Sequence, residues 1–340
     1  MDRKVAVALA AILAVASVLA GCSDPDQSEP PVASSPPTTL RATTTTTTTP
    51  ASTTSTTEAR RVSWPPIPAG PPRAVVTASG VVLAVVRDDG DGRFLGRSPC
   101  GHEVVVTGTA IDGATVVLDP GHGGDEAGAI GHAGTAEKDV NLAVAQEAKR
   151  QLEALGATVV LTRNGDHRIT LASRAAIAMA LGPEVFVSIH HNADPDGPSE
   201  EPGAETYFQV ADPASKRAAG LLYEELLRVL RDHDIAWVAD RDAGAKHRRR
   251  SDGTDYYGIL HRTAGVPAVL SEAAFISNPP EEALLATPAF HAEEASAITE
   301  AVVRFVTTDD PGGGFVEPYP RSQPAGPGGG PAGCVDPPLG

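Results

Sequence analysis

Three apolar stretches of this 340-residue sequence end in side chains that can bind a metal or transfer a proton. The first ends at His122, inside the glycine-rich turn DPGHGG. The second ends in His190, His191 and Asn192, and the third carries Glu272. In open α/β sheets, ligands bind outside the carboxyl ends of the strands, so three such ends predict one site. A metal bound by His122 would explain the histidine together with its glycines, which let the backbone turn sharply and let a ligand approach closely.

Glu137 lies at the start of an expected helix and offers a carboxylate as a third ligand. Two histidines and one carboxylate, with an open position for water, form a common catalytic zinc set. The alternative interpretations are structural: an acidic residue near a helix N-terminus and histidines that only make hydrogen bonds at strand ends. Because neighbouring residues of a strand point to opposite faces, only one of His190 and His191 can face a metal easily.

Short apolar runs alternate with longer amphipathic stretches in residues 113–307, which predicts an α/β fold for this part of the chain. The expected strands are TVVLD, ATVVLT, VFVSIH, AETYFQV and PAVLSEA. The expected helices cover residues 139–155, 171–181, 213–231, 280–285 and 288–306. Gly156 is suited to end the first helix, and Thr287 followed by Pro288 is suited to begin the last.

Composition divides the rest of the chain. Residues 1–22 are typical of an export signal, with a basic start and an apolar run that is short for a membrane span. Residues 23–72 are rich in Pro, Ser and Thr, which predicts a disordered tether. Residues 73–112 contain Val-rich runs broken by Gly and Asp, which predicts a small β extension made of a hairpin and one more strand. Residues 308–340 form a Gly/Pro-rich tail, expected to be disordered unless Cys334 pins it.

The three cysteines carry separate predictions. The stretch that ends at Cys22 resembles the lipobox of a bacterial lipoprotein signal, which implies that Cys22 carries a lipid in the mature protein. The alternative is an ordinary secretory signal with an incidental cysteine. Cys100 and Cys334 could form one disulfide in an oxidising compartment, or remain two free thiols. Neither lies in a metal-ligand pattern, so a thiolate zinc site is not expected.

The formal net charge is −16. This argues against a nucleic-acid partner, because such binding depends on Lys and Arg that neutralise phosphates. The one basic cluster is the run from Lys246 to Arg250. We expect it to be a solvated loop, with contact to an anionic substrate as the alternative.

The order of the motifs LDPGHGG, EKDVNLAVA, LTR, LASRAAIA, VFVSIHHNA and PAVLSEAAFISN resembles the zinc-dependent N-acetylmuramoyl-L-alanine amidases of the type-3 family. The resemblance covers residues 115–306. It implies a twisted, mostly parallel sheet flanked by helices and one catalytic Zn²⁺. It also implies cleavage of the amide that joins N-acetylmuramic acid to L-alanine in peptidoglycan.

The resemblance also assigns residues. His122, Glu137 and His190 match the three metal ligands, and Glu272 matches the catalytic glutamate, expected to act as general base. His191 is then a pocket or supporting residue. Asp119 and Asn192 are expected to support the ligands, because metal-bound histidines usually donate their other N–H to an acceptor; for Asp119 a turn role is the alternative.

The predicted function is therefore an exported peptidoglycan hydrolase, anchored to the membrane by a lipid, facing the cell wall and acting as a monomer. Two other functions stay open. One is another zinc hydrolase of the same polymer, a carboxypeptidase or a deacetylase, which product analysis would distinguish. The other is a wall-binding lipoprotein without activity, for which a complete set of three ligands and a glutamate has no evident use.

Overall fold

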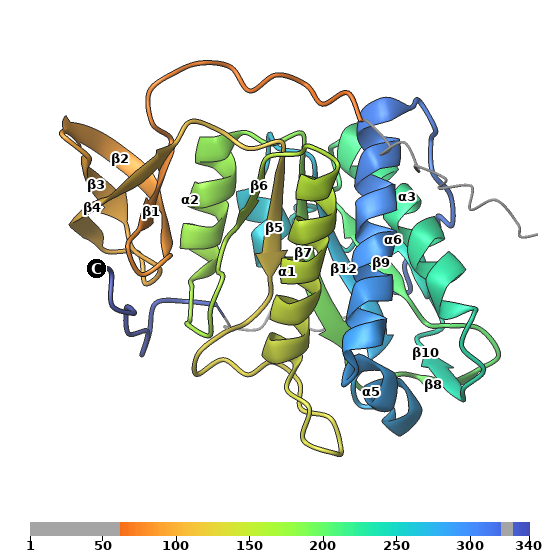
Figure 1. The fold of residues 1–340 in the computed structure, drawn as a ribbon. Coiled ribbons are helices and arrows are strands. Elements are labelled where there is room, and N and C mark those ends of the chain that lie inside the picture. Colours follow the sequence, from red (N-terminus) through yellow and green to blue (C-terminus); the bar gives the residue numbers. More distant parts are fainter. Residues whose placement is uncertain (1–61, 321–328) are drawn as a thin grey trace, which may run out of the picture. The chain divides into compact units, whose positions relative to one another are not determined.

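A computed structural model describes residues 62–320 and 329–340. Its centre is a six-stranded sheet in the order β11-β9-β12-β7-β5-β6 (Figure 1). The bounds are β5 (Val116–Pro120), β6 (Val159–Leu161), β7 (Val185–Asn192), β9 (Glu205–Phe208), β11 (Gly244–Lys246) and β12 (Ala268–Phe275). Every neighbouring pair is parallel except β9 and β12. The predicted α/β class with a mostly parallel sheet is confirmed.

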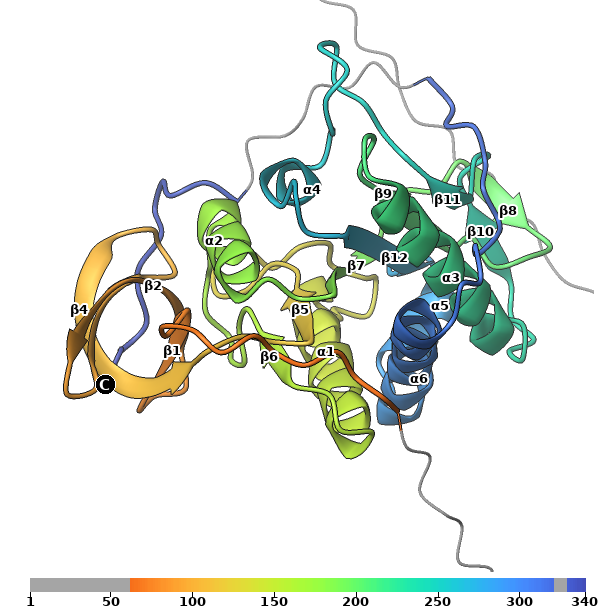
Figure 2. The ribbon, with the colours of Figure 1, turned by 90° about the horizontal axis from the view of Figure 1, so that it is seen from above.

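Helices cover both faces of the sheet (Figure 2). On one face lie α1 (Glu137–Ala154), α3 (Pro213–Leu230) and α6 (Pro288–Thr307), whose apolar side chains pack on Val116 and Leu118. On the other face lie α2 (Leu171–Leu181) and α4 (Gly258–Arg262), in the cluster that contains Val117. Alternate residues of β5 therefore enter opposite cores, and this is why a strand buried on both faces is a continuous apolar run.

Two predicted helix ends, at Gly156 and at Thr287, are confirmed. Gly156 follows the last turn of α1 with a φ of +92°, a left-handed conformation that glycine adopts without strain. Thr287 caps α6, and its Oγ1 accepts a hydrogen bond from the Phe290 amide at 3.2 Å. The short helix α5 (Pro279–Leu285) precedes α6. Helix α1 begins two residues earlier than expected, so that Glu137 is its first residue.

Four strands precede the sheet and close into a small barrel, visible end-on in Figure 2. They are β1 (Ala74–Thr77), β2 (Val82–Gly90), β3 (Arg93–Arg97) and β4 (Glu103–Ile111). The expectation of a hairpin and one more strand was one strand short, because the Val-rich run is split by a turn at Gly80. Pairing between β1 and β4 closes the barrel over a core that includes Leu83 and Phe94.

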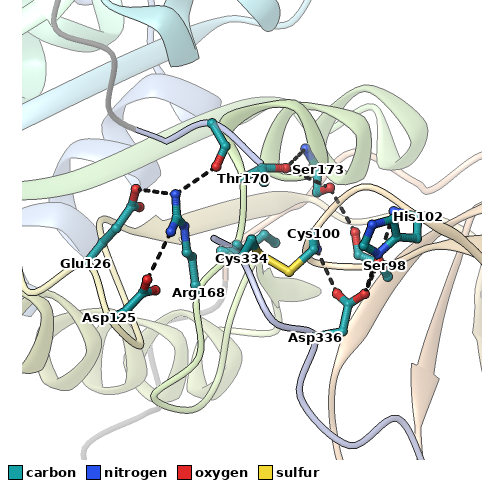
Figure 3. Close-up of a disulfide and its surroundings, with 12 residues drawn as sticks. Ser98, Cys100, His102, Asp125, Glu126, Arg168, Thr170, Ser173, Cys334 and Asp336 are labelled. Atoms are coloured by element: carbon teal, nitrogen blue, oxygen red, sulfur yellow. Dashed lines mark hydrogen bonds and ion pairs between the residues drawn. A yellow bond between two sulfur atoms is a disulfide. The ribbon is translucent and has the colours of Figure 1, made fainter. Parts of the chain in front are cut away.

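Residues at both ends of the described chain are also held in place. Trp64, at the end of the expected tether, donates its indole N–H to the Leu155 carbonyl at 2.8 Å. In the tail, Phe315 forms a bridge beside Ala245 of β11, and a disulfide joins Cys334 to Cys100 (Figure 3). The proposed lipid-bearing Cys22 and most of the expected tether lie outside the described residues. None of the described helices has the length and apolar character that a membrane span requires.

Three short strands and one short helix were not predicted. Strands β8 (Gly197–Ser199) and β10 (Trp237–Ala239) pair with each other. Strand β11 contains the first residue of the basic run, and α4 follows the run. The expectation that this run is a solvated loop was wrong for Lys246. That side chain is 1% exposed in β11, and its Nζ lies 2.9 Å from Glu205 and 2.8 Å from Asp242. Arg249, by contrast, is exposed.

We predict that Lys246→Met destabilises the protein by about 3–5 kcal/mol, because it leaves two buried carboxylates without their cation. The free energy of unfolding from guanidinium denaturation checks this. Arg249→Met removes the same charge from an exposed position and serves as the control, with an expected change within about 0.5 kcal/mol. Equal effects of the two substitutions would contradict the buried ion cluster.

Candidate metal and catalytic site

The predicted site residues meet at one edge of the sheet. His122 lies in the loop directly after β5, and His190 lies near the end of β7. Glu272 of β12 is the register partner of His190 on the neighbouring parallel strand. Glu137 reaches the same place from the first turn of α1. The carboxyl ends of three strands and one helix N-terminus thus surround a single point, as the sequence predicted.

Glu137 lies between the two histidine rings. Its Oε2 is 3.1 Å from His122 Nε2 and its Oε1 is 3.0 Å from His190 Nδ1. The rings meet edge to face with centroids 5.0 Å apart. One ligand atom from each residue lies within 4.8 Å of the others. Such a spacing of two imidazole nitrogens and a carboxylate matches the donor set of a divalent transition metal.

The carboxylate of Glu137 is buried and anchored by further donors. The Ala129 amide donates to Oε2 at 2.9 Å, while the His191 amide and the Asn141 side chain donate to Oε1 at 3.2 and 3.3 Å. Burial raises the pKa of Glu137, but the hydrogen bonds from the two histidines outweigh it and bring the pKa well below its ordinary value. Burial lowers the pKa of His190. An ionised carboxylate and a neutral imidazole are the forms that bind metals.

Two glycines leave room for this arrangement. A Cβ on Gly121 would overlap the His190 ring. A Cβ on Gly128 would lie 2.7 Å from the His122 ring and would also overlap the Glu137 carboxylate. His122 itself has a φ of +59°, a strained conformation for a residue with a side chain. Close packing of the three candidate ligands therefore requires glycine at positions 121 and 128.

Two buried arginines hold the strained loop. Arg163 donates to the carbonyls of Pro120 and Gly121 at 3.0 and 2.8 Å. Arg174 donates to the carbonyls of Pro120 and His122, both at 2.6 Å. The sequence analysis missed these roles, although both residues lie in motifs that it quoted, LTR and LASRAAIA. A charged residue inside an otherwise apolar pattern was the available signal.

Asp119 was expected either to support a histidine ligand or to be a turn residue, and among the described residues it hydrogen-bonds to neither His122 nor His190. Its carboxylate is 1% exposed and accepts hydrogen bonds from Thr162, Ser188 and Arg174 at 2.5, 2.8 and 2.7 Å. Burial raises its pKa, yet the charge of Arg174 and these hydrogen bonds leave the pKa below its ordinary value. Asp119 therefore acts on the His122 loop through Arg174.

His191 faces away from the candidate ligands, as strand alternation requires. Its Nδ1 is 2.8 Å from Asn141 Oδ1, and its Nε2 is 3.0 Å from Glu294 Oε2. A buried chain of polar groups thus runs from Glu294 of α6 to Glu137. Asn192, the other predicted supporting residue, donates to Glu205 at 3.4 Å and accepts from the Ala193 amide. Asn192 therefore lies beside Glu205 and its neighbouring carboxylates. Among the described residues it makes no hydrogen bond to His122 or His190.

Glu272 has a different environment from Glu137. Burial raises its pKa well above the ordinary value, and the nearby charges of Glu137 and Glu205 add to this effect. Its Oε2 is buried and has no hydrogen-bond partner within the described part of the chain. A buried carboxylate oxygen without a partner costs free energy, so its position points to a group that approaches from the site.

A second carboxylate cluster lies beside Glu272 but already contains a cation. Glu205, Asp240 and Asp242 each bring an oxygen within 4.8 Å of the others, and Lys246 makes ion pairs with two of them. The lysine ammonium supplies the positive charge that a metal would otherwise provide. We therefore assign this cluster a structural role.

A cavity of about 530 Å³ opens next to the candidate ligands. His122 and His190 lie in its wall, and Tyr257 lines it from the segment before α4. Apolar side chains form part of the lining, namely Ile169, Leu171, Ile259 and Leu270, and the charged residues Asp119, Glu126 and Arg174 also line it. An apolar hollow with a few convergent polar groups is the usual form of a substrate site.

Comparisons with known proteins identify a matching family, similar sequences and a similar solved structure. A family model described as N-acetylmuramoyl-L-alanine amidase matches residues 116–304. Uncharacterized protein YqiI of Bacillus subtilis is 35% identical over 194 residues, 56% of this chain and 84% of that protein. N-acetylmuramoyl-L-alanine amidase AmiA of Escherichia coli is 32% identical over 267 residues, 68% of this chain and 88% of that protein. The solved structure of Cwp6 from Clostridium difficile has 32% identity and a TM-score of 0.51, covering 57% of this chain and 30% of that one.

We predict that Asp119→Asn destabilises the protein by about 3–5 kcal/mol at pH 7, because Arg174 keeps its charge and loses its buried partner. The folded-state pKa of Asp119 is depressed. Its stabilising effect is therefore complete above the unfolded pKa of about 3.9 and is lost as the pH falls through the folded pKa. Denaturation of parent and variant between pH 7 and pH 3 should show their stability difference shrinking at the acidic end. A difference that stays constant over this range would contradict the assignment.

Proposed function

The chain belongs to the N-acetylmuramoyl-L-alanine amidase family, and we propose that it hydrolyses the amide between N-acetylmuramic acid and L-alanine in peptidoglycan. The observation that carries this proposal is the convergence of His122, Glu137 and His190 on one point, with Glu272 on the adjacent strand. All four residues lie within the region that the family model matches. The cavity beside them supplies space for the substrate.

We propose that His122, Glu137 and His190 hold a Zn²⁺ ion. Two observations support the fit: the three donors cluster within 4.8 Å, and one oxygen of nearby Glu272 is buried without a partner. Two histidines and one carboxylate are a known catalytic zinc set. A bound Zn²⁺ would lower the pKa of a water ligand and polarise the scissile carbonyl.

Glu272 is the proposed general base and then the general acid. A carboxylate with a raised pKa can accept a proton from the attacking water and return it to the departing L-alanine amine. The neighbouring negative charges of Glu137 and Glu205 contribute to the raised pKa of Glu272. Those charges make proton uptake easier, and Lys246 holds Glu205 in position. Glu137, with its low pKa, is unsuited to the same task, so the two carboxylates divide the roles of ligand and base.

The proposed location follows from the substrate and from the first residues of the sequence. Peptidoglycan lies outside the cytoplasm, so an enzyme of this activity has to be exported. We propose that residues 1–22 direct export and that Cys22 becomes the lipid-bearing N-terminus. A tether of about forty residues, ending where the described chain begins, would then let the enzyme domain reach tens of ångströms from the membrane, by coil scaling.

We predict that Glu272→Gln retains the bound metal and loses about 10²–10⁴-fold in activity, because only proton transfer is removed. His122→Ala should lose both the metal and the activity, since a ligand is removed. Metal content by atomic spectrometry and release of stem peptide from purified peptidoglycan measure the two properties separately.

His132→Ala is the matched control for this pair, because His132 is an exposed histidine close to the same loop. It should leave metal content and activity unchanged. An active Glu272→Gln variant would exclude Glu272 as the base, and full metal occupancy in His122→Ala would exclude His122 as a ligand.

A further inference from the structure

The C-terminal residues 329–336, here called the strap, lie beside the candidate active site. Gly329 lines the same cavity as His122, Glu126 and Leu171. The strap lies outside residues 116–304, the region that the family model matches. A segment outside the matched region thus contributes to the wall of the proposed substrate site.

Backbone hydrogen bonds fasten the strap at its cavity end. The Leu171 amide donates to the Gly329 carbonyl at 2.9 Å, and the Gly329 amide donates to Glu126 at 3.1 Å. Arg168 donates to the Gly330 carbonyl at 2.8 Å. The first residue of a helix has no intrahelical acceptor for its amide, so the strap satisfies the amide of Leu171 at the start of α2.

The other end of the strap is fastened to the barrel (Figure 3). Cys334 forms the disulfide with Cys100. Asp336 accepts hydrogen bonds from Ser98 Oγ and the Cys100 amide, both at 2.8 Å, and lies 2.9 Å from His102 Nδ1. Beyond the strap, Leu339 packs against the barrel core.

These contacts fix the strap at both of its ends. Both ends are held by groups outside the candidate ligand set, and the carboxylate of Glu126 and the guanidinium of Arg168 are used by the strap itself. Gly329 also passes so close to α2 that a Cβ there would lie 2.5 Å from Leu171 Cγ. The strap thus fills space at the cavity edge with backbone whose polar groups already have partners.

We propose that the strap is a specificity-determining wall that restricts the bulk of the peptide branch entering the cavity. The inference rests on the proposed function, since the branch is the stem peptide of peptidoglycan. A wall at this edge would admit an uncross-linked stem and hinder a stem that is cross-linked to a second strand. The disulfide would hold that wall in place.

The first experiment tests whether the disulfide holds the strap, and it does not depend on activity. In the Cys100→Ser/Cys334→Ser double variant of the full chain, hydrogen exchange of the Leu171 amide should accelerate by at least about tenfold. Asp336→Ala retains the disulfide and loses three contacts, so it should show a smaller acceleration. Unchanged hydrogen exchange of the Leu171 amide in both variants would overturn the claim that these contacts hold the strap in place.

The second experiment measures kcat/KM for two soluble muropeptides, an uncross-linked monomer and its cross-linked dimer. The parent should prefer the monomer, and this preference should fall by at least about fivefold in the double variant at equal metal content. Phe94→Leu weakens the barrel core, which contains no residue of the strap, and should leave the preference unchanged. An unaltered preference in a variant whose strap is released would overturn the proposal.

Failure of the proposed function would look different from failure of the wall. If the parent cleaves neither muropeptide, the proposed activity fails. The dissociation constants of the same two muropeptides, measured by calorimetry, then test whether the strap restricts the stem peptide. A monomer preference in binding that falls in the double variant supports the wall, and a preference that stays the same overturns it.

Discussion

The site depends on one buried carboxylate placed between two imidazole rings. Glu137 carries its charge in a region that water hardly reaches, which is costly unless every oxygen has a partner. The rings of His122 and His190, the amides of Ala129 and His191, and the Asn141 side chain provide those partners. A bound cation would further stabilise the buried negative charge of Glu137. Gly121, Gly128 and the buried polar chain to α6 serve to bring these groups together.

A strained loop also has to be prevented from relaxing, and two buried arginines do this. Arg163 and Arg174 bind successive carbonyls of the turn that carries His122, and Asp119 balances the charge of Arg174. Hydrogen bonds from charged donors are stronger than neutral ones. The turn is therefore held by the protein's own groups, which is the preorganisation that a catalytic metal site would require.

Periodicity and strand order predicted the fold and the convergence of His122, His190 and Glu272 at one edge of the sheet, because strand ends and alternation are local properties of the sequence. Alternation separated His190 from His191 correctly. It could not identify what His191 contacts, since Glu294 is 103 residues away in the chain. Lys246 was misplaced because a run of charges is normally solvated, and its acidic partner Glu205 lies on another strand. The fourth barrel strand and the three-residue strands depend on pairing rather than on pattern, so the sequence held little signal for them.

The most direct test of the central claim is the chemical identity of the products. Purified peptidoglycan would be digested with the folded chain, with and without a chelator, and the soluble products analysed by mass spectrometry. The account predicts free stem peptides that begin with L-alanine, beside intact glycan, with release abolished by the chelator and restored by Zn²⁺. Loss of only a terminal amino acid, release of acetate, or peptide release that persists under chelation would contradict it.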